Sequence, residues 1–301
     1  MTARKRLSVL LADDGSQHAQ AAIDLLGSLP LPPKTRVSAL RVFTPGQVDM
    51  LPAFERTLEV TRQRVERMGI PAQGQVLLGH PAEKIIEVSK ERRADLILMG
   101  AKGLRATLGI LLGGVAQQVV EYADCPVLVV RAPWRGLQRV LLVTDGSPTS
   151  QAAVRYLAGF PLPASVDLHV MHVLAPEQQA VAMEMYAASW RPIYVPIYTE
   201  EELAAQAKRE QARGQAVLKR TCSLLQRHGL TPIPELRSGD AATEILDYAK
   251  ENQVDLIVAG SHGWSAVRSW WMGSVSRKLV HYAGCSVLIV KAPHKEVSHG
   301  D

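Results

Sequence analysis

Residues 260–274, GSHGWSAVRSWWMGS, carry glycines and hydroxyl side chains at a spacing that suits an anion site. An apolar, β-branched run precedes them, and a segment with helical spacing of apolar residues follows. The start of such a helix presents unpaired N–H groups and a positive dipole end, which favour a phosphate. Gly260 and Gly263 would allow tight bending and close approach of a ligand, and Ser274 would cap the helix or donate to a phosphate oxygen. Glycines alone would equally suit an ordinary strand–helix loop.

The same pattern occurs twice in the chain. Residues 100–114, GAKGLRATLGILLGG, have glycines at the first, fourth and fourteenth positions, as residues 260–274 do. A helical segment, a cysteine and an apolar strand follow each loop, in YADCPVLVVRAP (122–133) and YAGCSVLIVKAP (282–293). An internal duplication of this kind indicates one structural unit built twice.

Composition narrows the class of protein. A chain of 301 residues, 47% hydrophobic and 5% aromatic, is typical of about two α/β domains with aliphatic cores. The sequence has no apolar run of the ~18 residues that span a bilayer and no secretory signal, so we expect a cytoplasmic protein without a membrane partner. The net charge of +5 is dispersed, which argues against a nucleic-acid partner, and three cysteines argue against a disulfide framework.

Strands and helices alternate in both copies. The strands are apolar on both faces, which predicts parallel sheets covered by helices on both sides. Right-handed crossovers then give two tandem, doubly wound, five-stranded sheets. We expect domains at 1–133 and 138–294. The expected strands are 7–12, 37–43, 75–78 and 95–100 in the first copy and 139–144, 166–173, 233–236 and 255–260 in the second, each copy ending with the strand after its cysteine.

The second copy is longer than the first. From Asp14 to Gly100 the chain advances 86 residues, and from Asp145 to Gly260 it advances 115, so the second copy holds 29 extra residues. Most of them are expected within 175–215, as a lid, an interface arm or a longer helical connection.

Ligands of open parallel sheets bind at the carboxyl ends of the strands, where the strand order reverses. Asp145 ends the first strand of the second copy and Gly260 ends its fourth, so an aspartate that can accept from a ribose hydroxyl lies beside a phosphate loop. The end of the second strand would line a base pocket.

Several other chemistries do not match the residues. The sequence lacks a Gly-Lys dipeptide, and neither loop contains G-x-G-x-x-G, which disfavours a lysine-bearing phosphate loop and a dinucleotide site. His80 and His262 have no serine or cysteine at triad-like positions, and Ser16 and Ser147 suit turns or helix caps better than nucleophiles. We predict no catalytic residue and no metal-ligating residue.

The motif G-x2-G-x9-G-S, with DGS after the first strand and C-x-VLIV after the last helix, resembles the universal stress protein family. The resemblance covers nearly the whole chain as two copies. It implies the strand order 3-2-1-4-5, an adenine-nucleotide site and a role in bacterial stress physiology. It also implies that strands 127–130 and 287–290 pair, joining the halves as an intramolecular pseudo-dimer, while association into a homodimer stays open.

The resemblance places the ATP-binding positions of each copy at three strand ends and at the start of the last helix. In the second copy they are Val143, Thr144, Asp145, Val173, Ala259, Gly260, Gly263, Gly273, Ser274 and Val275, and in the first Ala12, Asp13, Asp14, Val42, Met99, Gly100, Gly103, Gly113, Gly114 and Val115. Mg²⁺ can accompany ATP there.

The first copy departs from the family pattern at two positions. Gly114 stands where the family has serine or threonine, which removes a hydroxyl donor, and Asp13 adds a second carboxylate beside Asp14. A carboxylate near phosphate is unfavourable unless a metal or another cation intervenes. We therefore predict tighter ATP binding in the second copy.

The second loop also holds Trp264, Trp270 and Trp271. We expect them to pack the loop against the other domain, with covering a nucleotide or contacting a partner as alternatives.

The leading hypothesis is a regulatory protein that binds ATP and hydrolyses it slowly at most. One alternative is an interaction or scaffold protein with vestigial sites, and another is an ATP-using enzyme without a visible catalytic motif.

Overall fold

The computed structural model describes residues 6–103, 112–175, 199–263 and 272–291. Strands and helices alternate through both halves, as the hydrophobic pattern predicts. The strands are β1 (Ser8–Ala12), β2 (Arg36–Phe43), β3 (Ala72–Leu78), β4 (Leu96–Gly100), β5 (Val127–Val130), β6 (Arg139–Val143), β7 (Asp167–Leu174), β8 (Pro232–Ser238), β9 (Leu256–Gly260) and β10 (Ser286–Val290). The helices are α1 (Gln17–Ser28), the 3-10 helix η1 (Pro45–Met50), α2 (Leu51–Arg67), α3 (Pro81–Glu91), α4 (Gly114–Tyr122), α5 (Pro148–Ala158), α7 (Glu200–Gln226), α8 (Ala241–Glu251) and α9 (Ser274–Tyr282).

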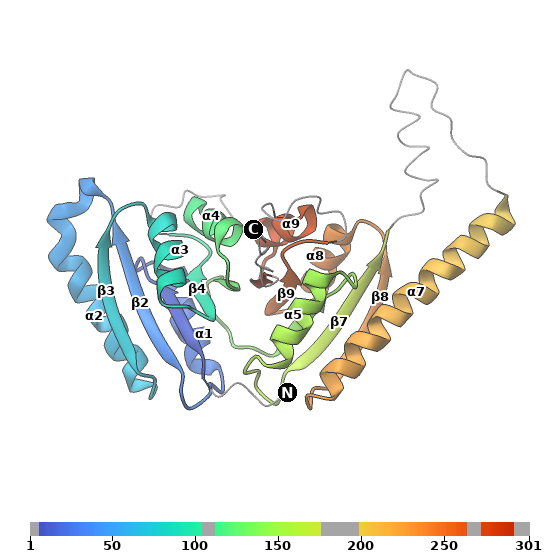
Figure 1. Cartoon of the computed structure of the whole chain (residues 1–301), viewed down its shortest axis with the longest axis horizontal. Coiled ribbons are helices and arrows are strands. Elements are labelled where there is room, and N and C mark those ends of the chain that lie inside the picture. The colour runs from blue at the N-terminus through green and yellow to red at the C-terminus, as the bar shows by residue number, and fades with distance from the viewer. Residues whose placement is uncertain (1–5, 104–111, 176–198, 264–271, 292–301) are drawn as a thin grey trace, which may run out of the picture.

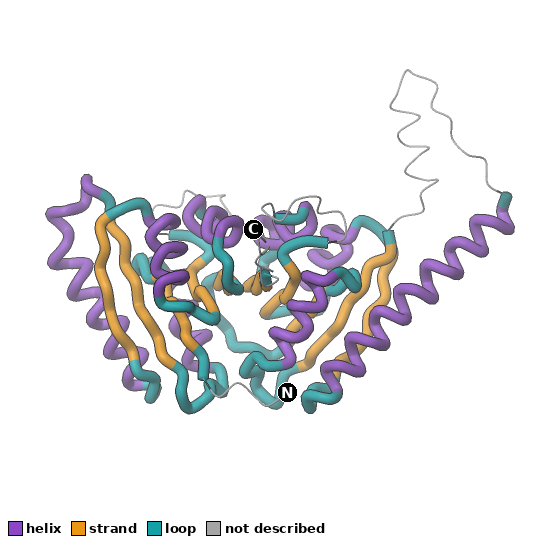
Figure 2. The backbone as a smooth tube through the Cα atoms, viewed as in Figure 1, coloured by secondary structure: helices purple, strands orange, loops and turns teal. Residues whose placement is uncertain are grey.

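The described strands form one sheet in the order β3-β2-β1-β4-β5-β10-β9-β6-β7-β8. Within each half the strands are parallel and follow the order 3-2-1-4-5, so the predicted fold class is confirmed. The two five-stranded sheets are continuous with each other through the β5–β10 pair (Figure 2).

Helices cover both faces of this sheet because its strands are apolar on both sides. Val9 and Leu11 of β1 pack in the layer that holds α1, α2, α5 and α7. Leu10 packs on the other face, against the layer of α3, α4, α8 and α9. All three side chains are at most 1% exposed. The alternation places the carboxyl ends of β1, β4, β6 and β9 between two helix layers.

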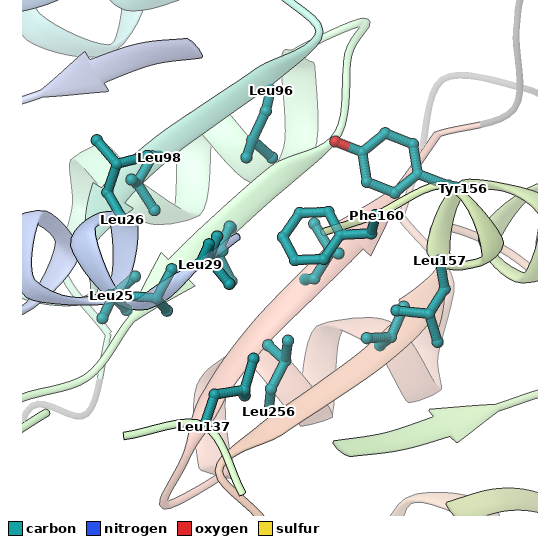
Figure 3. Packing of buried hydrophobic residues seen from close by; sticks show 14 of the residues in the cluster. Leu25, Leu26, Leu29, Leu96, Leu98, Leu137, Tyr156, Leu157, Phe160 and Leu256 are labelled. Atoms are coloured by element: carbon teal, nitrogen blue, oxygen red, sulfur yellow. The ribbon is translucent and has the colours of Figure 1, made fainter. Parts of the chain in front are cut away.

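The two halves join through β5 and β10. Leu128 lies opposite Leu288 in an antiparallel pair, and both are fully buried. The predicted pairing of the last strands is therefore confirmed. The core continues across this junction, where Leu96 and Leu98 lie in the same cluster as Leu157 and Leu256 (Figure 3).

A basic residue follows each of these two strands and reaches into the opposite half. Arg131, after β5, donates from Nη2 to the carbonyl oxygens of Val280 (2.9 Å) and His281 (3.3 Å) in α9. Lys291, after β10, donates from Nζ to the carbonyl oxygen of Glu121 (3.0 Å) in α4. Each half thus places a basic side chain at the C-terminus of the equivalent helix in the other half, where positive charge is favourable.

Replacing Lys291 with methionine is expected to change how stability depends on pH. Burial lowers the pKa of Lys291 to about 8 from its ordinary 10.5, against the opposing effects of Asp124, Glu121 and Cys125. Between those two pH values the unfolded chain holds a proton that the folded chain has lost, so this lysine favours folding increasingly as pH rises through that window. From pH 7 to pH 10.5 the unfolding free energy of the wild type should rise by about 1–3 kcal/mol relative to Lys291→Met.

Chemical denaturation of both proteins at the two pH values measures this difference. Parallel pH profiles would contradict the assignment. Because the variant retains the other titratable groups, the comparison isolates the lysine.

The length difference between the halves falls at one place. There are 57 residues between Leu174 of β7 and Pro232 of β8, against 28 between Phe43 of β2 and Ala72 of β3, which accounts for all 29 extra residues. Part of the insertion is the longer helical connection: α7 has 27 residues and α2 has 17. Helix α7 extends past the ends of β7 and β8 (Figure 1). Residues 176–198, which hold the aromatic part of the insertion, lie outside the described residues.

The third strand of each half is longer than predicted. β3 begins three residues before the expected range and β8 begins one residue before and ends two after it. Both are edge strands, where glycine and proline are tolerated because one side of the backbone has no ladder to maintain. Gly74, Pro232 and Pro234 therefore obscured these strands in the sequence.

Among the described helices, α7 included, none is both long and apolar enough to cross a membrane.

Candidate functional site

The turns after β1 and β6 have the same construction. Gly15 and Gly146 adopt positive φ values of 79° and 76°, a region that glycine enters without steric cost. Ser147 caps α5 by accepting from Ser150 N (3.2 Å), and Ser16 does the same for α1. The prediction that these serines are turn and cap residues is confirmed.

The same turn fixes the aspartate that precedes it. Asp145 Oδ1 accepts from Ser147 N at 2.9 Å, and Asp14 Oδ1 accepts from Ser16 N at 3.0 Å. Each carboxylate is therefore held at the carboxyl end of its strand, over the start of the following helix.

Gly260, at the end of β9, is required by packing and not by a turn. A Cβ there would lie 2.8 Å from Ser150 N and from Thr149 C, in the first turn of α5. Its φ is not positive, so close packing, and not a left-handed backbone conformation, accounts for the glycine here. The missing side chain instead lets α5 begin directly against β9, and Gly100 serves α1 in the same way.

Gly263 brings the loop after β9 against Asp145. A Cβ at Gly263 would lie 2.7 Å from Asp145 Oδ2, and one at Gly103 would lie 2.6 Å from Asp14 Oδ2. Neither glycine has a positive φ, so close approach is what demands glycine here. The carboxylate and the glycine loop are thus adjacent in space although 118 residues separate Asp145 from Gly263.

The far end of the loop leads into α9. Gly273 is the N-cap residue and Ser274 is the first residue of the helix. Of the two roles expected for Ser274, capping the helix is therefore wrong. Gly273 N donates to Ser261 O at 2.8 Å, which closes the loop at its base. The intervening residues, with Trp264, Trp270 and Trp271, lie outside the described part of the chain.

A cavity of about 330 Å³ opens where these elements meet, within the roughly 300–1,000 Å³ range of ligand sites. Its lining includes all ten residues that the sequence assigned to the second copy, drawn from β6, β7, β9, the glycine loop and α9. Six further lining residues were not predicted: Ser150, Met171, Ala241, Ile245, His262 and Ser276.

The first half has an equivalent cavity of about 450 Å³. All ten residues assigned to the first copy line it, from Ala12 to Val115. Its lining includes Arg41, Gln47, Phe54 and Leu112, which have no counterpart among the described residues that line the second cavity.

A model of the universal stress protein family matches residues 6–131 and again residues 136–291. The chain belongs to the universal stress protein family. A Thermus aquaticus protein, the universal stress protein in QAH/OAS sulfhydrylase 3'region, is 36% identical over 135 residues, which is 41% of this chain and 98% of that protein. Universal stress protein YxiE of Bacillus subtilis is 30% identical over 153 residues, 51% of this chain and 98% of the relative.

A solved universal stress protein from Archaeoglobus fulgidus DSM 4304 has the same two-copy extent. It superposes with a TM-score of 0.68 at 21% identity, covering 96% of this chain and 97% of that one. This likeness establishes the shared fold, and the chemistry of the cavities has to be argued from this chain's own residues.

One feature of the first universal stress protein unit corrects the sequence interpretation. The Asp13 carboxylate is fully buried and paired with the Arg41 guanidinium at 3.3 Å, itself only 5% exposed. Thr61 Oγ1 donates to Asp13 Oδ2 at 2.7 Å. The extra negative charge is therefore compensated by a neighbouring cation, and repulsion from Asp13 no longer supports weaker phosphate binding in this half.

The second universal stress protein unit replaces this ion pair with a threonine and a histidine. Thr144 and His172 occupy the positions of Asp13 and Arg41, as the strand registers show. His172 Nδ1 contacts the Thr144 carbonyl oxygen at 2.7 Å, and Arg41 Nε donates to the Asp13 carbonyl oxygen at 3.0 Å. The backbone contact is conserved between the halves while the side-chain chemistry differs.

Among the lining residues of the second cavity that the sequence did not predict, His262 has the side chain best suited to interact with a ligand. Its Nδ1 bonds to Ser261 Oγ at 2.9 Å, and its Nε2 is buried and has no hydrogen-bond partner within the described residues. Burial lowers the pKa of His262, with a smaller contribution from Lys291, so the ring is neutral at pH 7. The sequence signal was its position between Gly260 and Gly263, which a search for catalytic triads does not weigh.

Proposed function

We propose that this universal stress protein binds ATP in the second cavity and acts through its bound state. The observation that supports this most directly is the convergence of the ten expected positions on one cavity at the start of α9. A regulatory binding protein needs such a site and no dedicated catalytic group.

The cavity offers a separate environment for each part of the nucleotide. Met171, Val173 and Ile245 supply an apolar wall for the base. Asp145, held at the end of β6, would accept from the ribose hydroxyls. The assignment separates an apolar end from a polar end, as ligand sites commonly do.

The phosphates would lie at the start of α9. The first helical bond runs from Arg277 N to Gly273 O, so the N–H groups of Ser274, Val275 and Ser276 have no intrahelical partner. These donors, the positive end of the helix dipole and the Ser274 hydroxyl favour an anion. His262 Nε2 would add a donor from the loop if its Nδ1 accepts from Ser261.

We expect hydrolysis to be slow. Asp145 is the one carboxylate among the described residues of this lining, and it is assigned to the sugar. Efficient attack on the γ-phosphate requires a group that positions or deprotonates water. Mg²⁺ would accompany the triphosphate.

The direct test is to identify what the purified full chain carries and binds. Mass spectrometry of ligand released on denaturation, followed by titration calorimetry with ATP, ADP and GTP, should show an adenine nucleotide in a saturable site. cAMP should be tested in competition with ATP, because it is bound in the crystal structure of another universal stress protein. Failure of every adenine nucleotide to bind would overturn the proposal and favour an interaction or scaffold role.

Replacing Gly114 with serine is expected to strengthen ATP binding in the first cavity about tenfold. Gly114 is the first residue of α4, and a Cβ added there meets no atom within 4 Å, so the hydroxyl fits. A hydrogen bond to a charged phosphate oxygen is worth about 1.5 kcal/mol. Calorimetry on a Gly263→Val background, with the second cavity obstructed, measures the first cavity alone.

The matched control is Ser274→Gly in a Gly103→Val background, which should weaken the second cavity by a similar factor. Equal affinities for Gly114→Ser and its parent would show that the missing hydroxyl does not explain any difference between the halves.

A further inference from the structure

Helices α4 and α9 each connect a cavity to the junction between the halves. Each has nine residues and begins at the glycine loop of its own half. The two helices lie on either side of the middle of the molecule (Figure 1), where β5 pairs with β10. At 1.5 Å per residue, only about 13 Å separates the start of each helix from its end.

The C-terminal carbonyl groups of these helices bond to residues of the opposite half. In α9 the last helical bond runs from Ala283 N to Leu279 O, which leaves the following carbonyl oxygens for other donors. Arg131, which is 8% exposed, donates to two of them, those of Val280 and His281. Lys291 donates to the equivalent carbonyl oxygen of Glu121 in α4.

The backbone before each cation is tied to the loop of its own half. Ala101 N donates to Val130 O at 2.8 Å, immediately before Arg131. Ser261 N donates to Val290 O at 2.9 Å, immediately before Lys291. The backbone next to each cation is therefore bonded to the cavity loop of its own half. Its side chain is bonded to the helix that begins at the cavity of the other half.

A cation at the C-terminus of a helix and an anion at its N-terminus both stabilise the same dipole, and burial reduces screening of the first by salt. We infer that Arg131 is a positioning residue for the phosphate site of the second cavity, and Lys291 for that of the first. Each half supplies the charge that holds the phosphate-binding helix of the other. The inference rests on the proposed function, because it requires a phosphorylated ligand at these helices.

The test compares Arg131→Met and Lys291→Met in full-length proteins that each have one obstructed cavity. With Gly103→Val present, only the second cavity is open, and Arg131→Met should weaken ATP about five- to tenfold, the scale of the attraction between a buried cation and an anion roughly 13 Å away at an effective dielectric constant of about 20. Lys291→Met should weaken ATP in that cavity clearly less than Arg131→Met does, because Lys291 bonds to α4 and reaches this cavity through its effect on His262. With Gly263→Val present, the two variants should exchange roles.

Three further measurements separate positioning from general loosening of the junction. Adenosine, which has no phosphate, should bind every variant as it binds the parent, and Arg131→Lys should restore most of the ATP affinity. Amide hydrogen exchange without ligand should rise in α9 for Arg131→Met and in α4 for Lys291→Met.

The inference is overturned if Arg131→Met leaves ATP affinity unchanged, if both cavities respond alike, or if adenosine weakens as much as ATP. A parent protein that binds no ATP would remove the proposed function and this inference together. A parent that binds ATP while the charge variants behave as the parent removes the inference alone.

Discussion

Replacing Gly263 with valine is expected to weaken ATP binding at the second cavity by at least about a hundredfold, or about 2.7 kcal/mol. Even a Cβ at this position would lie 2.7 Å from Asp145 Oδ2, and a branched side chain adds atoms on the cavity side. The carboxylate would have to turn away from the loop, which removes the proposed ribose acceptor. Because the φ of Gly263 is not positive, the substitution introduces no backbone strain that would unfold the chain.

Two controls make the result specific. Gly103→Val creates the same contact with Asp14 in the first half, at 2.6 Å, and should leave the second cavity unaffected. Gly284→Ala adds a Cβ that meets no atom within 4 Å, and should bind as the wild type does. Titration calorimetry with ATP on the three full-length variants tests this prediction. Wild-type affinity in Gly263→Val would show that ATP does not occupy this cavity.

Replacing Arg41 with methionine is expected to lower the free energy of unfolding by about 3–5 kcal/mol. The substitution leaves the Asp13 carboxylate, which is fully buried, without its cation. Thr61 and Gly15 would still donate to the carboxylate oxygens, but neither supplies a charge. An uncompensated buried charge is among the few changes with effects of this size.

The second half provides the rescue for this variant. The double substitution Asp13→Thr with Arg41→His transfers the pair found at Thr144 and His172, leaves no buried carboxylate at position 13, and should recover most of the lost stability. Arg62→Met is the exposed control: Arg62 pairs with Glu59 and Glu66 on the surface of α2, where solvent screens such pairs and their loss should change stability little.

Chemical denaturation at neutral pH compares the four proteins. A loss below about 1 kcal/mol in Arg41→Met, or no recovery in the double variant, would contradict the role assigned to the buried pair.

The sequence predicted the fold because its signals are local and repeated. Apolar runs ending in DGS, glycines at fixed spacing and a cysteine before each final strand occur in both copies, and each copy confirms the assignment of the other. The strand order followed from the resemblance, and the lining of both cavities follows from it, since parallel strands bring their carboxyl ends to one edge.

What escaped prediction depends on contacts between distant residues. Arg41 lies 28 positions from Asp13, and only the pairing of β1 with β2 brings them together. The contact that requires glycine at position 260 could not be predicted, because the helix that packs against it begins more than 100 residues earlier. The cap of α9 was misplaced by one residue, from Gly273 to Ser274, because extended backbone geometry (φ −61°, ψ 152°) and not residue type decides that position.

The position of β5 and β10 at the centre of the sheet has a consequence for assembly. Each has a neighbour on both sides, so growth by strand addition is confined to β3 and β8 at the outer ends. Pro232 and Pro234 lack N–H groups, which makes β8 the poorer template of the two. In the described sheet, a single chain supplies both of the paired units, and the two edge strands of the sheet differ chemically.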